Sequence, residues 1–527
     1  MARLFEYQAK QILKEKGVKV PRGGVAHSPE EVRQIATHLN SPVVLKAQVW
    51  ITGRAEKGGI LFAQTPEEAE QSARQLFGRK IGRFIVEEIL VEEKLDIAQE
   101  FFAGLIIDDA AKKPVLVFSS VGGTGIEEIA KKNPDKIIRH PIKISSGLKE
   151  YEVRNLLRRH SFRGKLLVKL ASTLAKLYEI ARQVEARSLE VNPLALTQKG
   201  ELVAVDCHLA VDDYAVFRHP ELSIEIAREF DRPPTLLEKI AFQVEKDDYR
   251  GTFYFLQMQE DFSPEEMIIG FQGAGGGGSM MSMDAVLAQG FKLANYCDTS
   301  GNPPASKVYR AARIILSQPF LKGYFASGSG VASQEQYHSA RGLVKAFLEE
   351  NLTIPAVIRL GGNYEKVAIQ ILQTYLTRIK GVVEGYGQAD SAEFCAARLR
   401  ELVQENNSQN HLVSPLVYPD LDRYTYRFAT MTGEVLIDHQ ACENCRTKGC
   451  VKACLAEILQ LDEAGRPVLK VSSEEARQGR CTECLACEIF CKFHEQDAIY
   501  IYLPIPGLAE YRQQIIAQQQ AKAKEFE

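Results

Sequence analysis

The sequence predicts an α/β chain of several domains: a mixed front half, then a doubly wound parallel sheet, then a small cysteine-rich α+β module. Three observations predict this order. Strand-like and helix-like segments alternate with glycine loops through residues 245–390, as in parallel β–α–β units. Eight of the 11 cysteines lie within residues 442–491. The 527 residues exceed what one hydrophobic core accommodates, so about three or four domains are expected.

Composition excludes some partners. A hydrophobic fraction of 45% and a charged fraction of 25% are ordinary for globular proteins. The net charge of -3 gives no reason to expect nucleic acid or an acidic membrane as a partner. The polar start is unlike a signal peptide, and no apolar run approaches the roughly 20 residues of a spanning helix. We therefore expect a cytoplasmic protein with Cys207, Cys297 and Cys395 as buried thiols.

The front half opens with two predicted helices. Residues 4–16 carry apolar side chains on one side, and Gly17 ends that helix. Ser28 is the predicted N-cap of a second helix, with Pro29 at its first position.

A predicted strand over residues 42–49 carries one lysine, Lys46, and a glycine-rich loop follows over residues 52–59. The lysine supplies a point charge and the loop supplies backbone N–H groups, so the pair is suited to holding phosphates. The alternative is an ordinary strand lysine before a hairpin turn. The candidate loop residues are Gly53, Arg54, Lys57, Gly58 and Gly59.

Acidic and amide side chains mark the next strands. Glu92 and Glu100 belong to predicted strands at residues 89–92 and 96–102. A predicted hairpin over residues 188–206 places Glu190, Asn192 and Asp206 on adjacent strands. Hard oxygen ligands grouped in this way suit Mg²⁺ that bridges nucleotide phosphates.

Three strands in the middle of the chain each lead into a glycine loop. Glycine lets backbone amides approach an anion at a helix N-terminus, and parallel sheets bind ligands at the carboxyl ends of their strands. We therefore expect an anion or carboxylate site there. The strands and loops are 267–272 with 273–278, 321–326 with 327–330, and 355–360 with 361–363. The candidate glycines are Gly273, Gly275, Gly276, Gly328, Gly330, Gly361 and Gly362.

The cysteines of the tail form two runs of four. The second run, Cys-x2-Cys-x2-Cys-x3-Cys, has the spacing of bacterial [4Fe–4S] sites, and in two-cluster ferredoxins the fourth cysteine of each run binds the other cluster. Zinc is an alternative, although zinc knuckles have no use for a third cysteine two residues further on. Disulfides are another, although nothing suggests secretion. One predicted cluster takes Cys442, Cys445, Cys450 and Cys491; the other takes Cys481, Cys484, Cys487 and Cys454.

Five features of the front half together resemble one family. They are Phe-Glu-Tyr-Gln-Ala-Lys at 5–10, Val-Leu-Lys-Ala-Gln-Val at 44–49, Gly-Arg-x-x-Lys-Gly-Gly at 53–59, Glu-Val-Asn-Pro-Leu at 190–194, and Asp206. They resemble the ATP-grasp domain of the succinyl-CoA synthetase β subunit, and the resemblance runs from about residue 2 to about residue 395.

This resemblance implies roles for individual residues. Lys46 and the glycine loop, with Gly53, Arg54, Lys57, Gly58 and Gly59, would hold the phosphates of ATP. Glu92 would lie in the hinge that meets the adenine or ribose, and Glu100 would face the nucleotide. Asn192 and Asp206 would hold Mg²⁺, and Glu190 would be catalytic, touching a phosphorylated histidine as it visits the site.

The resemblance also implies partners. The middle domain would be flavodoxin-like and would dock on an α-type subunit that carries the phosphohistidine and most CoA contacts. None of the ten histidines lies in a matching context, so the chain is expected to need that subunit. The loop at 327–330 differs from the family's Gly-Gly-Ile carboxylate loop, which leaves the acid open. The tail resembles two-[4Fe–4S] ferredoxins, which implies a flavoprotein or ferredoxin as redox partner.

Two functional hypotheses follow. The first is the β-type subunit of an ADP-forming acyl-CoA synthetase, which uses ATP, CoA and a carboxylic acid, with a fused electron-transfer module. The second is an iron–sulfur subunit of an acyl-CoA redox complex, with a synthetase-like body that binds nucleotide or CoA ester as a scaffold. The predicted domains are ATP-grasp 1–235, flavodoxin-like CoA-ligase 236–400, linker 401–426, ferredoxin-like 427–505 and a C-terminal helix 506–527.

Overall fold

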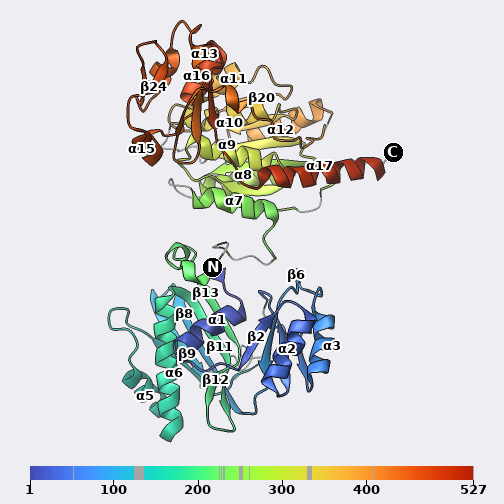
Figure 1. The fold of residues 1–527 in the computed structure, drawn as a ribbon, viewed down its shortest axis with the longest axis vertical. Helices are drawn as coiled ribbons and strands as arrows, with labels where there is room; N and C mark the ends of the chain where they lie inside the picture. The colour runs from blue at the N-terminus through green and yellow to red at the C-terminus, as the bar shows by residue number, and fades with distance from the viewer. Residues whose placement is uncertain are drawn as a thin grey trace. The chain divides into compact units, whose positions relative to one another are not determined.

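The chain divides into two compact units, Met1–Pro234 and Thr235–Glu527, which are coloured along the chain in Figure 1. The division lies one residue from the boundary expected between the first two domains. The structure, a computed structural model, describes residues 1–51, 53–123, 136–224, 226, 228, 232–247, 253–259, 262–328, 335–407 and 409–525.

The smaller sheet of unit 1 has the strand order β2-β7-β3-β4, and all its pairings are antiparallel. Helices α2 and α3 lie together against this sheet (Figure 1). Ser28 and Thr65 cap them, and a proline follows each cap, which fixes where both helices begin. The elements are β2 (Gly23–Ala26), α2 (Pro29–Leu39), β3 (Val43–Ala47), β4 (Ile60–Ala63), α3 (Pro66–Leu76) and β7 (Ile89–Glu93). A separate two-stranded ribbon pairs β5 (Lys80–Ile81) with β6 (Phe84–Ile85).

The larger sheet of unit 1 has the order β1-β13-β11-β8-β9-β10, and β12 pairs with β11. Helix α6 and the first helix, α1, pack on it and share one hydrophobic core with it. The strands are β1 (Ala2–Arg3), β8 (Ile97–Asp108), β9 (Lys113–Ser119), β10 (Ile137–Pro141), β11 (Ala186–Thr197), β12 (Leu202–Ala204) and β13 (Cys207–Val211). The helices are α1 (Glu6–Glu15), α5 (Glu150–Arg159) and α6 (Gly164–Gln183).

The main sheet of unit 2 has the order β14-β17-β15-β18-β19-β20. All its strands run parallel except β14, which is antiparallel to β17. Numbered along the chain, the five parallel strands have the order 2-1-3-4-5. The strands are β14 (Tyr254–Gln257), β15 (Ile268–Ala274), β17 (Asn295–Asp298), β18 (Gly323–Gly328), β19 (Ala356–Arg359) and β20 (Val383–Tyr386); a short β16 (Lys292–Leu293) pairs with β15.

Helices cover both faces of this sheet, and the hydrophobic core is correspondingly in two parts. Residues of α9 and α10 belong to one apolar cluster, and residues of α8 and α12 belong to the other. The helices are α7 (Leu236–Lys246), α8 (Gly276–Ala288), α9 (Ala305–Ile315), α10 (Tyr337–Glu349), α11 (Glu365–Tyr375) and α12 (Ala392–Glu405).

The cysteine-rich module forms the rest of unit 2. A three-stranded antiparallel sheet has the order β21-β22-β25, and a small hairpin joins β23 to β24. The strands are β21 (Tyr426–Ala429), β22 (Glu434–Ile437), β23 (Leu459–Leu461), β24 (Pro467–Leu469) and β25 (Ile499–Tyr502). The helices are α13 (His439–Cys442), α14 (Gly449–Ala453), α15 (Ser473–Glu475), α16 (Ala486–His494) and α17 (Leu508–Glu525).

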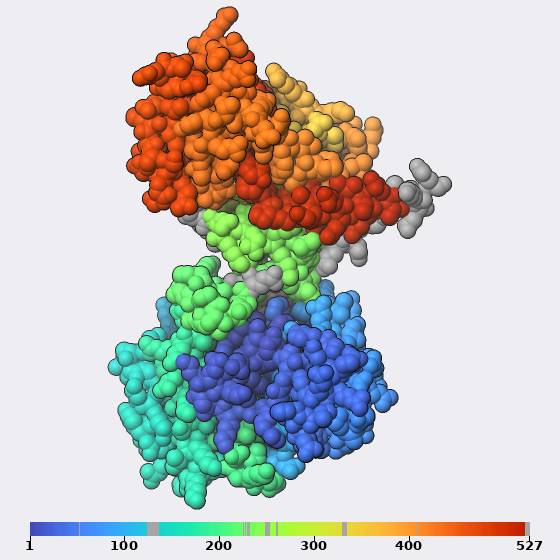
Figure 2. Space-filling model, in the orientation of Figure 1, coloured from blue at the N-terminus to red at the C-terminus, as the bar shows by residue number. Residues whose placement is uncertain are grey.

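The cysteine-rich module packs directly against the parallel-sheet body. One apolar cluster contains body residues such as Phe347 and module residues such as Ile501. Helix α17, dark red in Figure 2, returns to the body and packs against α7. The segment expected as a linker begins inside α12, which continues to Glu405. Farther along it, the backbone of His411 bonds to Phe320 and Leu321.

Candidate nucleotide and cysteine sites

A crevice of about 1700 Å³ opens in unit 1 between α1, the β2–β7 edge of the smaller sheet and the turn after β11. Lys10 and Glu92 line it, together with Lys94 from the segment after β7. Glu92, predicted for the hinge, is thus a wall of this crevice and is buried.

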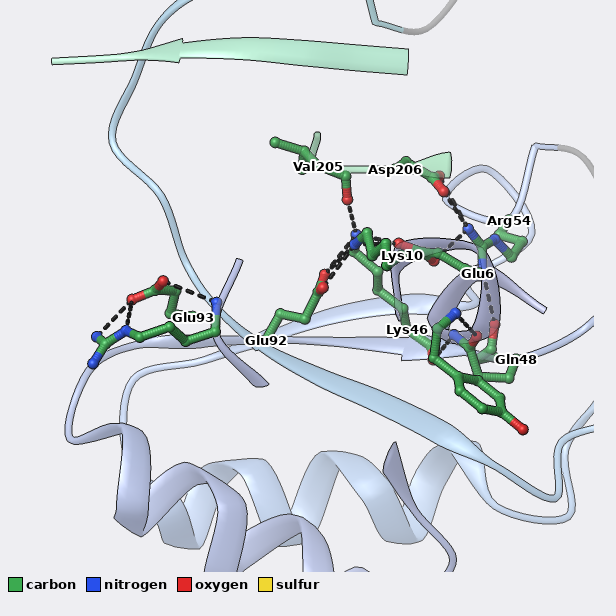
Figure 3. Close-up of polar contacts among 12 residues, drawn as sticks. Glu6, Lys10, Lys46, Gln48, Arg54, Glu92, Glu93, Val205 and Asp206 are labelled. Atoms are coloured by element: carbon green, nitrogen blue, oxygen red, sulfur yellow. Dashed lines mark hydrogen bonds and ion pairs between the residues drawn. The ribbon is translucent and has the colours of Figure 1, made fainter. Parts of the chain in front are cut away.

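Lys46 is buried at the end of β3 (Figure 3). Its ammonium group donates to Glu6 Oε1 at 2.7 Å and to the Val205 carbonyl at 2.6 Å, and it pairs with Glu92 Oε2 at 3.0 Å. The buried lysine is therefore held by acceptors from both sheets of unit 1. Burial by itself would lower the pKa of Lys46, but the charges of Glu6, Glu92 and Asp206 hold it above its usual value.

Arg54, from the glycine loop, reaches the residue predicted to hold Mg²⁺. Its Nη2 donates to Glu6 Oε2 at 2.7 Å and to both carboxylate oxygens of Asp206 at 3.0 Å. Its Nη1 donates to the carbonyl of Ala47 at 3.2 Å. Burial alone would lower the pKa of Arg54, but Glu6 and Asp206 raise it.

Glu6 and Lys10 are the functional residues that sequence reasoning missed. Both are on α1 and both are buried. Lys10 donates to both oxygens of Glu92 at 2.7 Å and pairs with Glu6 at 2.7 Å. Burial would raise the pKa of Glu6, but Lys10, Lys46 and Arg54 together hold it well below its usual value. A signal was present, since two charged residues four apart share one helix face with the apolar residues Ala9 and Leu13.

The backbone of the glycine loop closes on itself. Gly53 and Gly58 have φ angles of +68° and +70°, which favour glycine. The Lys57 amide donates to the Gly53 carbonyl at 3.3 Å, and the Gly59 amide donates to the Arg54 carbonyl at 2.7 Å. The Lys57 side chain is exposed, so of the two predicted basic residues only Arg54 is turned into the buried cluster.

Glu100 and Asn192 lie together at a second point of unit 1. The Asn192 Oδ1 atom accepts from the Gly123 amide at 2.7 Å. A Cβ atom at Gly123 would lie 2.5 Å from Glu100 Oε2, so the glycine makes room for that carboxylate. The backbone N–H of Asn192 donates to the backbone carbonyl of Asp206 at 3.2 Å, so the two predicted Mg²⁺ ligands occupy adjoining positions of the hairpin. Glu190 is half-buried on β11, opposite His208.

The glycine loops of unit 2 follow β15, β18 and β19, whose ends are adjacent in the sheet. Helix α8 begins at Gly276, three residues before the expected Ser279, because Gly275 takes a φ of +90° and donates to Asp298 Oδ1 at 2.9 Å. A Cβ atom at Gly273 would lie 2.1 Å from Ser279 Oγ, so the helix can approach the strand only at a glycine.

The two later loops are fixed by neighbouring side chains. The Gly328 carbonyl accepts from Arg359 Nη1 at 3.1 Å. After Gly361, the Gly362 amide donates to Glu365 Oε2 at 3.3 Å. Gly330, also predicted for this site, lies outside the described residues.

The cysteines of the module gather in two groups, and each group draws on both runs. Burial, and after it the Cys491 thiolate, raises the pKa of Cys442 to about 11 and the pKa of Cys450 to about 12. Cys445 contributes to both shifts. Burial, and after it the charges of Cys484, Cys481 and Cys454, raises the pKa of Cys487 well above its usual value. A small cavity is lined by that group: Cys454, Cys481, Cys484 and Cys487.

A single bound ion is a poor fit to these cysteines. Among the described residues, no three His, Cys, Asp or Glu side chains stand close enough to share one metal ion. A cubane imposes a different condition, because each of its four thiolates binds a different iron and the sulfurs stand farther apart. The two groups supply four thiols each, which is the number that a cubane requires.

Comparison with known proteins identifies the family. A model of the ATP-grasp domain matches residues 3–196. The β subunit of the GDP-forming succinate–CoA ligase of Thermus thermophilus is 38% identical over 370 residues, which cover 70% of this chain and 93% of that protein. The chain belongs to the family of succinate–CoA ligase β subunits. The ADP-forming β subunit of Ignicoccus hospitalis is 36% identical, with coverage of 70% and 93%.

A solved structure of ATP citrate lyase from Methanothrix soehngenii, in complex with citrate and coenzyme A, has the same fold over most of this chain. The TM-score is 0.64 at 18% identity, with 76% of this chain and 99% of that chain covered. Membership of the succinate–CoA ligase family makes the chain a subunit of an ADP-forming acid–thiol ligase type of enzyme. In the described part of the chain, every helix is too short or too polar to cross a membrane.

Proposed function

We propose that this chain is the nucleotide-binding β-type subunit of an ADP-forming acyl-CoA ligase and carries a built-in iron–sulfur electron-transfer module. The observation that carries the ligase half is the charge cluster around Lys46 in a member of this family; two residues of the cluster, Lys10 and Glu92, line the crevice of unit 1. Lys46 and Arg54 supply cations for the phosphates of ATP. Glu92 and Glu100 take the base or ribose side of the nucleotide.

The same site has oxygen donors for Mg²⁺. Asp206 supplies a carboxylate and Asn192 an amide oxygen, the donor types that Mg²⁺ prefers. Bound there, Mg²⁺ would neutralise charge on the β- and γ-phosphates. Both donors now have protein partners, Arg54 for Asp206 and Gly123 for Asn192, so binding requires these contacts to rearrange.

An α-type partner subunit would complete the reaction. Glu190 would meet a phosphohistidine supplied by that partner, which also carries the CoA site. The 2-1-3-4-5 strand order is that of flavodoxin-like sheets, and it supports a docking role for unit 2. The module covers the α9 and α10 side. On the other side, Met280 and Met281 of helix α8 are exposed, as expected for a surface that a partner subunit would cover.

The module would hold two [4Fe–4S] clusters, which exchange single electrons when bound. Cys442, Cys445, Cys450 and Cys491 would hold one, and Cys454, Cys481, Cys484 and Cys487 the other; the crossed grouping of the thiols supports this. Its redox partner would be a flavoprotein or a ferredoxin in the reducing cytoplasm. The second candidate function, an electron-transfer subunit on a nucleotide- or CoA-ester-binding scaffold, is favoured by the firm attachment of the module to the body.

Acyl-CoA synthesis tests the ligase half. The full chain would be incubated with labelled ATP, CoA and a panel of carboxylic acids, with and without an α-type subunit. We expect acyl-CoA only with the partner, and label on a partner histidine. Robust synthesis by the chain alone would contradict the two-subunit mechanism. No synthesis with any partner, but reversible reduction, would favour the scaffold function.

Metal analysis tests the module. Anaerobically purified full chain should contain about eight iron and about eight sulfide per chain. Cys484→Ser should lose close to half of the iron, whereas Cys395→Ser, which changes a buried thiol of the body, should keep it. Stoichiometric zinc without sulfide would rule the clusters out.

A further inference from the structure

The carboxylate of Glu6 links the two sheets of unit 1 at the nucleotide site. Glu6 lies on α1, which packs against β13 of the larger sheet. Lys46 and Arg54 belong to β3 of the smaller sheet and to the loop that follows it. One oxygen of Glu6 accepts from Lys46 and the other accepts from Arg54, each at 2.7 Å. A single side chain thus fixes both cations assigned to the phosphates.

The six charges around Glu6 balance. Lys10, Lys46 and Arg54 carry three positive charges, and Glu6, Glu92 and Asp206 carry three negative charges. Balanced pairs are what buried charges require. A nucleotide adds negative charge, and its Mg²⁺ adds positive charge, so both must enter by exchanging partners within this set.

Asp206 is the member placed to exchange. Its side chain is 20% exposed, whereas that of Glu6 is 1% exposed. The Arg54 guanidinium lies on both of its oxygens, where Mg²⁺ would bind. One nitrogen of Arg54, Nη2, lies 3.0 Å from both oxygens of Asp206, so Mg²⁺ held by those two oxygens would take the place of Arg54.

We infer that Glu6 is a positioning residue of the nucleotide site. It keeps Arg54 anchored while the guanidinium turns from Asp206 to the phosphates of an incoming Mg²⁺–nucleotide. The inference rests on the proposed ATP site and goes beyond it, because it assigns a role to a residue outside the glycine loop. The planar guanidinium has several N–H donors. It can therefore keep the Glu6 and Ala47 bonds and release Asp206 alone.

The decisive comparison uses three variants of the full chain, with affinity for Mg²⁺–ATP measured by calorimetry and thermal stability measured beside it. Glu6→Gln should weaken Mg²⁺–ATP about 10- to 100-fold, and it also leaves an excess buried cation. The double variant Glu6→Gln with Lys10→Met restores charge balance, so it should regain thermal stability but not affinity. Glu179→Gln, an exposed glutamate on α6, is the matched control and should change neither.

The outcomes separate this inference from the site itself. Wild-type affinity in the charge-balanced double variant would overturn the inference, because Glu6 would then only neutralise Lys10. No Mg²⁺–ATP binding by the wild type would overturn the nucleotide site and this inference with it. Mn²⁺ alone gives a test without nucleotide: Arg54→Ala should bind it about tenfold more tightly than wild type. An unchanged Mn²⁺ affinity would overturn the exchange at Asp206.

Discussion

Two buried charge networks, one in each unit, have the same balance of charges and join different parts of the molecule. The nucleotide-site cluster in unit 1 is Glu6, Lys10, Lys46, Arg54, Glu92 and Asp206. The module clamp in unit 2 is Arg313, Lys345, Glu349, Glu350, Glu488 and Arg512. Each has three cations and three carboxylates. The most exposed member is Asp206 in the first, at 20%, and Glu349 in the second, at 15%.

The module clamp joins the body to the cysteine-bearing helix. Lys345, on α10, donates to Glu488 at 2.5 Å and pairs with Glu349 at 2.8 Å. Glu488 lies on α16 between Cys487 and Cys491. Arg512 of α17 bonds Glu350 through two nitrogens, at 2.5 and 2.7 Å. The two networks differ in what they join: the module clamp connects the body to the module, whereas the nucleotide-site cluster ends at Asp206, the residue proposed to hold Mg²⁺. The comparison teaches that a balanced buried network can be a structural joint in one unit and a candidate ligand site in the other.

Breaking the module clamp should have the largest effect. Arg313→Met leaves Glu349 and Glu350 short of a buried partner, so we expect a loss of about 3–5 kcal/mol in the stability of unit 2. Urea unfolding of the full chain, followed by circular dichroism, measures it. Arg477→Met, which removes an exposed ion pair of the module, is the control and should leave the transition in place. Equal, small shifts of the unfolding transition in both variants would show that the module clamp stabilises unit 2 no more than an exposed ion pair does.

Breaking the nucleotide-site cluster should mainly affect ligand binding. Lys46→Ala removes a charged donor, worth roughly 1.5–3 kcal/mol, so affinity for Mg²⁺–ATP should fall about 10- to 150-fold. Asp206→Asn should weaken binding through the metal. Calorimetry on the full chain checks both, and Lys165→Ala, an exposed lysine of α6, serves as the control. Unchanged affinity for Mg²⁺–ATP in both site variants would contradict phosphate binding at this site.

Lowering the pH should weaken both networks. The loss of stability should be smallest near neutral pH. Burial opposes it, but the surrounding cations hold the pKa values of Glu6 and Glu350 below the usual value. A depressed pKa gives stability that is fully present above the unfolded value of about 4.3 and is lost as pH falls toward the folded value. Thermal unfolding between pH 7 and pH 3 should therefore show both units weakening below about pH 4.3. In Glu6→Gln the slope should flatten in unit 1 only; an unaltered slope would contradict the assignment to Glu6.

Much of the fold follows from local patterns. Ser28 with Pro29 fixes the start of α2, and the glycine loops after the parallel strands fix the order of strand and helix in unit 2. The crossed grouping of eight cysteines, as ligands, stays a prediction from spacing until metal is measured. The segment around His411 was expected to be a linker because its Asn, Ser and Pro content is typical of linkers. Its hydrogen bonds to Leu321 and Gln519 could not be foreseen, because those residues lie far away in the sequence.

The sequence by itself determined which residues are candidates for the chemistry proposed here. Lys46, Arg54, Asp206 and the cysteine runs are recognisable because their spacing is local and their side chains suit phosphates, Mg²⁺ and iron. Only the tertiary structure decided that Arg54 donates to Asp206, that Glu6 accepts from both Lys46 and Arg54, and that Lys345 pairs with Glu488 of the module. The physical reason is charge balance. A buried charge must be met within hydrogen-bond distance, and the partner that meets it comes from a strand or helix that no local pattern connects to it.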